Sequence, residues 1–252
     1  ILAGLFCQML LLPGIAFAIS SLFNMAPEYK VGIMIISACP GGATSNLITH
    51  LLKGNVALSI SLTAFNSLIT LISIPLITGF ALSWFYHHDS NIALQAGSTI
   101  LKLFLMTILP VVTGLLLRYH KKRLADRLDK PLRFLMTISL AVVYVIAAFN
   151  SGNGSSDEAN ILKQLHIFPY VLLLNIAGMS SGLLVAWLLG YGKKIKITYS
   201  VEVGIQNSAM AITIAGSPAF LNNAMMAMPA LIYALFTFFS AVLFGLLVKR
   251  WL

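Results

Sequence analysis

The stretch ACPGGATSNLITH, residues 38–50, decides the fold. It places Pro40, Gly41 and Gly42, followed by hydroxyl and amide side chains, inside an apolar segment long enough to cross a membrane. In hydrocarbon every backbone N–H and C=O needs a partner, so unwound backbone is tolerated only where it is buried in protein or lines a polar cavity. The sequence therefore predicts a broken membrane helix with a binding site at the break.

A second apolar segment is interrupted by SVEVGIQNSAM, residues 200–210, which carries Glu202, Gln206 and Asn207. Paired interruptions in the two halves of a chain are the best sequence indication of a transporter's binding site near the middle of the membrane. The two stretches together favour a secondary transporter.

The composition indicates an all-α polytopic membrane protein. Hydrophobic residues make up 59% of the chain and charged residues only 9%. The net charge of +9 would suggest nucleic acid as the partner of a soluble chain, but here the basic residues fall between apolar segments and report topology. Cys7 and Cys39 lie in apolar stretches without metal-ligand spacing, so we expect free thiols.

Eight apolar segments of roughly membrane-spanning length follow one another, with connections too short for a soluble domain. They cover residues 1–23, 31–52, 56–86, 93–118, 131–149, 167–190, 196–217 and 226–251. Of the 16 Lys and Arg residues, 13 fall on one side of the alternating loops and 3 on the other. This asymmetry predicts a multi-pass protein of the inner (plasma) membrane with a cytoplasmic C-terminus.

The two breaks fall in the second and seventh segments, five segments apart. An odd offset means that matching segments enter the membrane from opposite sides, which is typical of an inverted repeat. A five-helix repeat places two further helices before Ile1, so we expect ten helices in the complete protein.

Glu202 is the one acidic residue of seven that lies inside an apolar segment. An intramembrane carboxylate is costly and indicates a functional site, and no Lys or Arg lies near it in sequence. A bound cation is its most economical partner. The structural alternative is a protonated Glu hydrogen-bonded between helices.

Hard cations such as sodium prefer oxygen ligands, and several candidates stand at useful spacing. Ser45 and Asn46 follow the first break, and Ser59 and Thr63 are four residues apart and share one helix face. These hydroxyls could instead bond the carbonyl one turn back.

Gln8 is the strongly polar residue of the first segment and lies five residues before Pro13, where the helix can kink. It could equally serve as a hydrogen-bonding contact between helices. Backbone carbonyls freed around Val203 to Ile205 would supply more oxygens.

The half-helices that begin near Ala43 and Gln206 would point their positive N-termini toward the middle of the membrane. Unpaired N–H groups there favour an anion, and Asn207 can donate an amide hydrogen bond at the same place. An organic anion bound beside sodium is the electrostatically consistent cargo.

These stretches also resemble a known family. The segments ACPGGATSNLITHLLKGNVALSISLTA and EVGIQNSAMAI are similar to the two signature stretches of the bile acid:sodium symporter family, and FCQMLLLPG resembles the helix before the first. The resemblance runs over the whole chain and implies a bacterial homologue of the sodium-dependent bile acid transporters. In one respect the chain departs from the family, whose members often have Thr-Ala after the glycines where this chain has Ala43-Thr44.

The resemblance implies ten helices with two crossed broken helices, and a core and a panel domain. Residues 1–92 and 151–252 would form the core, with broken helices at 31–52 and 196–217, and 93–150 would form part of the panel. Two sodium ions are implied. The expected residues are Ser45, Asn46, Ser59, Thr63 and Glu202 for the first ion, Gln8, Glu202, Val203, Ile205 and Gln206 for the second, and Ala43, Thr44 and Asn207 for the substrate.

The resemblance further implies sodium-coupled uptake of an organic anion, such as a bile acid, a steroid conjugate or a small carboxylic acid, by alternating access. We expect the anion and the lipid bilayer as partners, with no nucleic acid, no obligate protein partner and no enzymatic activity. The alternatives are an arsenite or other anion efflux permease that pairs Cys39 with Glu202, a sodium/proton antiporter and a membrane receptor.

Overall fold

The computed structural model describes residues 1–86, 105, 112–114, 116–128, 131, 164–218 and 220–251. The predicted spans at 93–118 and 131–149 lie largely outside these residues. The count of eight spans and the inverted repeat therefore stay predictions.

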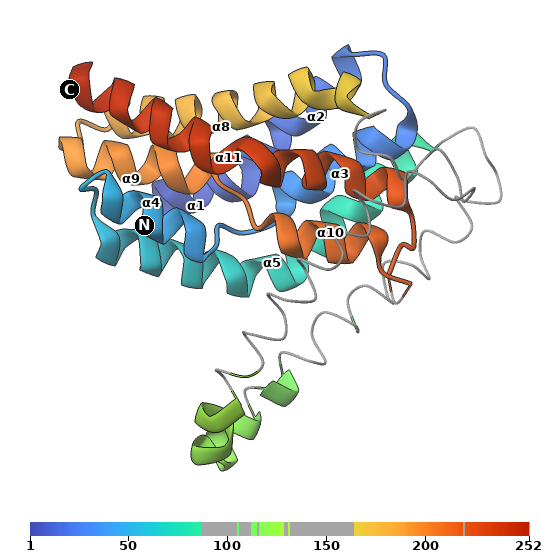
Figure 1. Cartoon of the computed structure of the whole chain (residues 1–252), viewed down its shortest axis with the longest axis horizontal. Coiled ribbons are helices and arrows are strands. Elements are labelled where there is room, and N and C mark those ends of the chain that lie inside the picture. Colours follow the sequence, from blue (N-terminus) through green and yellow to red (C-terminus); the bar gives the residue numbers. More distant parts are fainter. Residues whose placement is uncertain are drawn as a thin grey trace.

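The described chain folds into long helices and two broken segments (Figure 1). Four helical stretches are long and apolar enough to cross a membrane, namely Leu2–Leu22, Val56–Phe85, Leu165–Leu188 and Ala224–Val248. The first comprises α1 (Leu2–Phe6), a π-helix (Cys7–Leu11) and α2 (Leu12–Leu22); the others contain α5 (Val56–Phe85), α8 (Phe168–Leu188) and α11 (Ala224–Trp251). The broken segments are α3 (Pro27–Ala38) with α4 (Ala43–Leu51), and α9 (Lys193–Gly204) with α10 (Ser208–Gly216).

The first break follows from Pro40 and its neighbours. Cys39 is extended, with φ −71° and ψ 145°, as expected for a residue that precedes a proline. Gly42 is also extended, and the chain re-enters a helix at Ala43 at 64° to α3. The predicted break is confirmed, and so is the predicted start of the second half-helix.

The second break lies at Ile205–Asn207. Ile205 is extended, with φ −114° and ψ 118°, which ends α9 at Gly204. Asn207 Oδ1 then accepts a hydrogen bond from Met210 N at 3.1 Å and caps α10. The helix therefore begins at Ser208, slightly later than the predicted start near Gln206, because Asn207 acts as its N-cap.

The two breaks meet. The backbone N–H of Asn207 donates to the carbonyl of Pro40 at 2.8 Å. On one side of this bond α4 contacts α9, and on the other α3 contacts α10. Figure 1 shows the same arrangement, with α4 and α9 on the left and α3 and α10 on the right.

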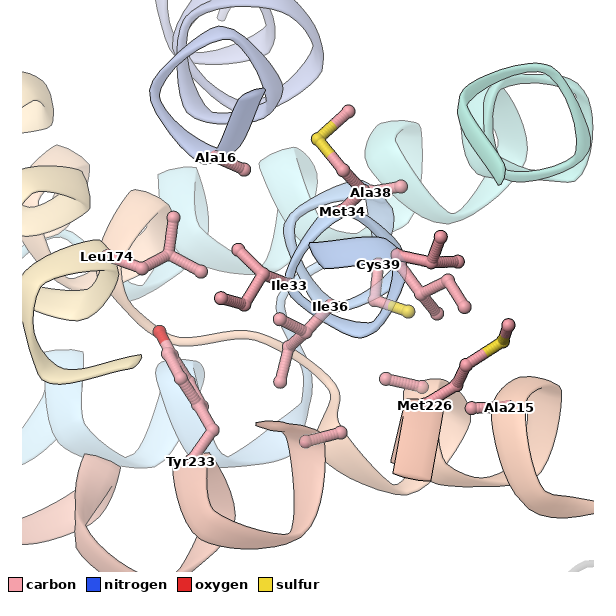
Figure 2. Packing of buried hydrophobic residues seen from close by; sticks show 14 of the residues in the cluster. Ala16, Ile33, Met34, Ile36, Ala38, Cys39, Leu174, Ala215, Met226 and Tyr233 are labelled. Carbon is pink, nitrogen blue, oxygen red and sulfur yellow. The ribbon is translucent and has the colours of Figure 1, made fainter. Parts of the chain in front are cut away.

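Helix α3 lies at the centre of the described helices. Its residues from Val31 to Ala38 are all buried, as expected of a helix that is surrounded by other helices. Figure 2 shows Ile33 and Ile36 of α3 among side chains from α2, α8, α10 and α11. Outer helices instead expose large apolar side chains, as a lipid-facing surface does; on α5 these include Ile60, Phe65, Leu68, Ile72, Leu76, Phe80 and Trp84.

Candidate functional site

Glu202 lies in the last turn of α9 and is only 1% exposed. Its carboxylate accepts hydrogen bonds from three hydroxyl groups on α4 and α5. Ser45 Oγ donates to Oε1 at 3.0 Å, Ser59 Oγ donates to the same oxygen, and Thr63 Oγ1 lies 3.2 Å from Oε1 and 3.1 Å from Oε2. The hydroxyls predicted as cation ligands thus converge on the predicted carboxylate.

The Ser59 hydroxyl lies near two oxygen acceptors. Ser59 Oγ contacts Asn46 Oδ1 at 2.7 Å as well as Glu202 Oε1, yet one hydroxyl can donate only one proton. Thr49 Oγ1, 3.4 Å from Ser59 Oγ, has a proton of its own, and the Gly42 carbonyl near Ser45 Oγ also accepts from the backbone N–H of Ser45 at 3.1 Å. A bound cation would satisfy the oxygen that the Ser59 proton does not reach.

Gly41 brings the backbone of the first break close to these oxygens. A Cβ atom at Gly41 would lie 2.6 Å from Glu202 Oε2, 3.1 Å from Ser45 Oγ and 3.6 Å from the carbonyl oxygen of Ile205. In the described part of the chain no hydrogen-bond donor reaches that Ile205 oxygen. Three oxygens therefore lie close to the backbone of Gly41, an approach that the absence of a side chain at residue 41 permits.

The donor set fits sodium. It consists of carboxylate, hydroxyl, amide and backbone oxygens, which hard cations prefer. Cys39, the residue on which the arsenite alternative depends, is fully buried in the apolar cluster of Figure 2. Among the described residues there is also no group of three or more His, Cys, Asp and Glu side chains that could hold a metal ion.

The second predicted set of cation ligands gathers around Gln8 and Gln206. Gln8 Nε2 donates to Gln206 Oε1 at 2.6 Å and to the carbonyl of Cys39 at 3.0 Å, while Gln206 Nε2 donates to the carbonyl of Val203 at 2.8 Å. Gln8 Oε1 is buried and has no hydrogen-bond partner within the described residues. An unpaired amide oxygen in this position is a ready cation ligand.

The backbone around Gln8 is a π-helix, Cys7–Leu11, that ends two residues before Pro13. The proline has no N–H and its ring crowds the carbonyl four residues earlier, so a regular helix is disfavoured there. π-helices of one turn are frequent at functional sites. The predicted irregularity before Pro13 is present as a widened turn.

The predicted substrate residues lie where two helix N-termini come together. Ala43 and Thr44 are exposed in the first turn of α4, and Asn207 is half-buried at the start of α10. Asn207 lies beside Gly42, since a Cβ there would be 3.9 Å from Asn207 Cβ. Both N-termini carry positive partial charge and can attract an anion.

Sequence alone did not single out several residues of this region. Thr49 is fully buried beside Ser59, and its spacing of four residues from Ser45 on α4 was an available signal. Asn175 and Tyr233 contact the end of α9 from α8 and α11, and no local pattern links them to it. Gly41 was recognised as part of the break but not as the residue that faces the carboxylate.

Comparisons with known proteins show the family of this chain. A family described as the sodium bile acid symporter family matches residues 1–156. The human protein "Sodium/bile acid cotransporter 4" is 29% identical over 250 residues, which cover 97% of this chain and 55% of the relative.

Two further relatives come from a bacterium and a plant. The "Uncharacterized sodium-dependent transporter YocS" of Bacillus subtilis is 30% identical over 85% of this chain and 64% of its own length. The "Probable sodium/metabolite cotransporter BASS1, chloroplastic" of Arabidopsis thaliana is 29% identical over 84% and 50%. The chain thus spans about half to two thirds of the length of these relatives. It is a multi-pass membrane protein of a family of transporters rather than enzymes, and the matched residues place it in the sodium bile acid symporter family.

Proposed function

We propose that the protein is a sodium-coupled symporter that takes up an organic anion. The observation that carries the proposal is the buried Glu202 carboxylate, which is surrounded by the hydroxyls of Ser45, Ser59 and Thr63 and shares the one Ser59 proton with the amide oxygen of Asn46. Removing such a charge from water is costly unless a counter-charge accompanies it. Sodium is the counter-charge that an oxygen-only shell favours.

The proposal assigns two sodium ions to the site. One ion would be held by Ser45, Asn46, Ser59, Thr63 and Glu202, and the other by Gln8, Glu202, Gln206 and the backbone at Val203 and Ile205. Gln8 Oε1 and the Ile205 carbonyl, which have no hydrogen-bond partner within the described part of the chain, support the second assignment. Glu202 is shared, so each ion changes the electrostatic field that the other experiences.

Coupling to the anion follows from charge. The anion would bind at the N-termini of α4 and α10, near Ala43, Thr44 and Asn207. Without bound cations the nearby negative charge of Glu202 opposes its binding, and with them the opposition disappears. The affinity for the anion therefore depends on sodium. By linkage, the affinity for sodium depends on the anion by the same factor.

The larger architecture belongs to the proposal as well. We infer a core domain from residues 1–92 and 151–252, a panel that includes 93–150, and alternating access between them. The excess of Lys and Arg on one side of the loops supports a plasma (inner) membrane location with the C-terminus in the cytoplasm. Labelling a cysteine introduced after the last helix in intact cells and in inverted vesicles tests this orientation.

The decisive experiment for function is uptake into liposomes that contain the complete purified protein. Taurocholate, a steroid sulfate, pantoate and pyruvate serve as probes, each with an inward gradient of sodium or of potassium at equal ionic strength. We expect at least one probe to accumulate with sodium and not with potassium. Uptake that is equal in both salts, or sodium-independent efflux of an oxyanion, would contradict the proposal.

A further inference from the structure

A buried polar cluster on α8 and α11 has no part in the proposed ligand sets. Asn175 of α8 and Tyr233 of α11 are 0% and 1% exposed. Asn175 Nδ2 lies 3.0 Å from Tyr233 Oη, and Ser240 Oγ donates to Asn175 Oδ1 at 2.7 Å. Figure 2 shows the Tyr233 hydroxyl reaching toward α8. Buried side chains with such complete hydrogen bonding fix one arrangement of the helices that carry them.

The cluster is directed at the carbonyl of Gly204, the last residue of α9. In a continuous helix this oxygen would accept from the N–H of Ser208. Ile205 is extended, however, and Ser208 N donates to the carbonyl of Gln206 at 2.9 Å instead. Asn175 Nδ2 at 2.6 Å and the Tyr233 hydroxyl donate to Gly204 O, so two side chains replace the lost helical bond.

Gly204 stands between the backbone groups proposed to bind the second sodium ion. Its carbonyl points toward α8 and α11, whereas the carbonyl of Ile205 lies near Gly41 and Glu202. Each peptide unit is planar, and the two carbonyls belong to consecutive residues, so only the φ and ψ rotations of Ile205 lie between them. Holding Gly204 O from one side therefore limits the directions that the Ile205 carbonyl can take on the other.

We propose that Asn175 and Tyr233 are positioning residues that clamp the broken end of α9 and thereby set the affinity and the size selectivity of the cation site at Val203, Ile205 and Gln206. The inference rests on the proposed function. The two side chains contact neither the ion nor the anion. They act by keeping backbone oxygens at the spacing that suits sodium, because a site whose ligands are loosely held discriminates poorly between ions of different size.

The test uses Tyr233→Phe and Asn175→Leu in the complete protein. Each variant removes one donor to Gly204 O and keeps most of the side-chain volume. Ser200→Ala is the matched control, because Ser200 Oγ donates to the carbonyl of Met179 at 2.9 Å and also ties α9 to α8, one turn before the break. The readouts are thermal stability without sodium, and the concentrations of sodium and of lithium that give half of the maximal stabilisation.

We expect each clamp variant to raise the half-maximal sodium concentration about threefold to tenfold, the size of effect that one lost hydrogen bond produces. The ratio of the lithium to the sodium value should move toward one. Ser200→Ala should leave both unchanged even where it lowers stability.

Three results overturn the inference. The first is that both clamp variants have the half-maximal sodium concentration of the wild type and only their stability falls. The second is that Ser200→Ala shifts the half-maximal sodium concentration as much as the clamp variants do. A wild-type protein without any sodium response refutes the proposed function itself and this inference with it. If Asn175→Leu does not accumulate in the membrane, Tyr233→Phe decides alone, since it keeps the ring in its apolar surroundings.

Discussion

Gly41→Ala tests the cation site with the smallest possible change. The added methyl group would lie 2.6 Å from Glu202 Oε2 and 3.1 Å from Ser45 Oγ. Real Cβ atoms essentially never approach a non-bonded heavy atom within 3.0 Å, so the carboxylate oxygen and the Cβ of residue 41 must move apart by at least 0.4 Å, the difference between 3.0 Å and 2.6 Å. Glu202 is 1% exposed and held by three hydroxyls, so its displacement disturbs the cluster as a whole.

The expected effect on sodium binding is large. A hydrogen bond to a charged group contributes about 1.5–3 kcal/mol, and the substitution weakens at least one such contact with Glu202. At about 1.4 kcal/mol for each factor of ten, the half-maximal sodium concentration should rise about tenfold to a hundredfold. A displacement of this size is close to the tolerance of about 0.5 Å within which binding geometries must be held.

The assay is a sodium titration of thermal stability in detergent, at ionic strength held constant with potassium. A ligand at ten times its dissociation constant stabilises the folded state by about 1.4 kcal/mol, which gives a measurable shift of the melting temperature. Uptake of the best probe in liposomes, measured over the same sodium concentrations, provides an independent value.

Gly42→Ala is the matched control. A Cβ there would meet Asn207 at 3.9 Å, an ordinary contact, and the φ of −135° suits any residue. We expect its half-maximal sodium concentration to stay within about twofold of the wild-type value, which is less than the change that the loss of one hydrogen bond to a charged group produces. If Gly41→Ala also stays in that range while folding normally, the oxygens around Gly41 do not bind sodium and the reasoning fails.

Other substitutions address the remaining ligands. Glu202→Ala should abolish sodium-dependent stabilisation and flux while folded protein still reaches the membrane; a full sodium response would remove Glu202 from the mechanism. Ser59→Ala with Thr63→Val should raise the half-maximal sodium concentration by about tenfold or more, two hydrogen bonds to a charge being lost. Ser67→Ala, which removes an exposed α5 hydroxyl bonded to the carbonyl one turn back at 2.7 Å, should not, and equal shifts in both would mean a general effect on the helix. Gln8→Leu should lower the Hill coefficient of the sodium titration, because it removes a ligand of the second ion alone; an unchanged coefficient with a uniform loss of affinity contradicts the two-ion assignment.

The breaks could be predicted from local sequence because their causes are local. Pro40 forces Cys39 to be extended, and Gly42 continues the unwound backbone up to Ala43. The second break lacks a proline, and its approximate place came from Glu202, Gln206 and Asn207, polar residues that an intact membrane helix would not carry together. Its exact end at Ser208 depends on the Asn207 side chain capping α10, which the sequence allowed but did not require.

Other features depended on helices that meet only in the folded chain. Asn175 is a single amide in the apolar helix α8, and nothing near it in sequence indicates that it bonds Gly204 or Tyr233, 29 and 58 residues away. The π-helix at Gln8 had a weak signal in Pro13, but its register is fixed by the bonds of Gln8 to Cys39 and Gln206.

By itself the sequence determined that this chain is a membrane protein, that two of its helices are broken, and which kinds of atoms lie at the breaks. These properties follow from hydrophobicity, from proline and glycine backbone preferences and from the cost of polar groups in hydrocarbon, all of which act over a few residues. The tertiary structure decided which oxygens face one another. Ser45 and Thr63 reach Glu202 across 157 and 139 residues of chain, and Gln8 reaches Gln206 across 198, so these contacts form only when α4, α5, α9 and the first helix pack together.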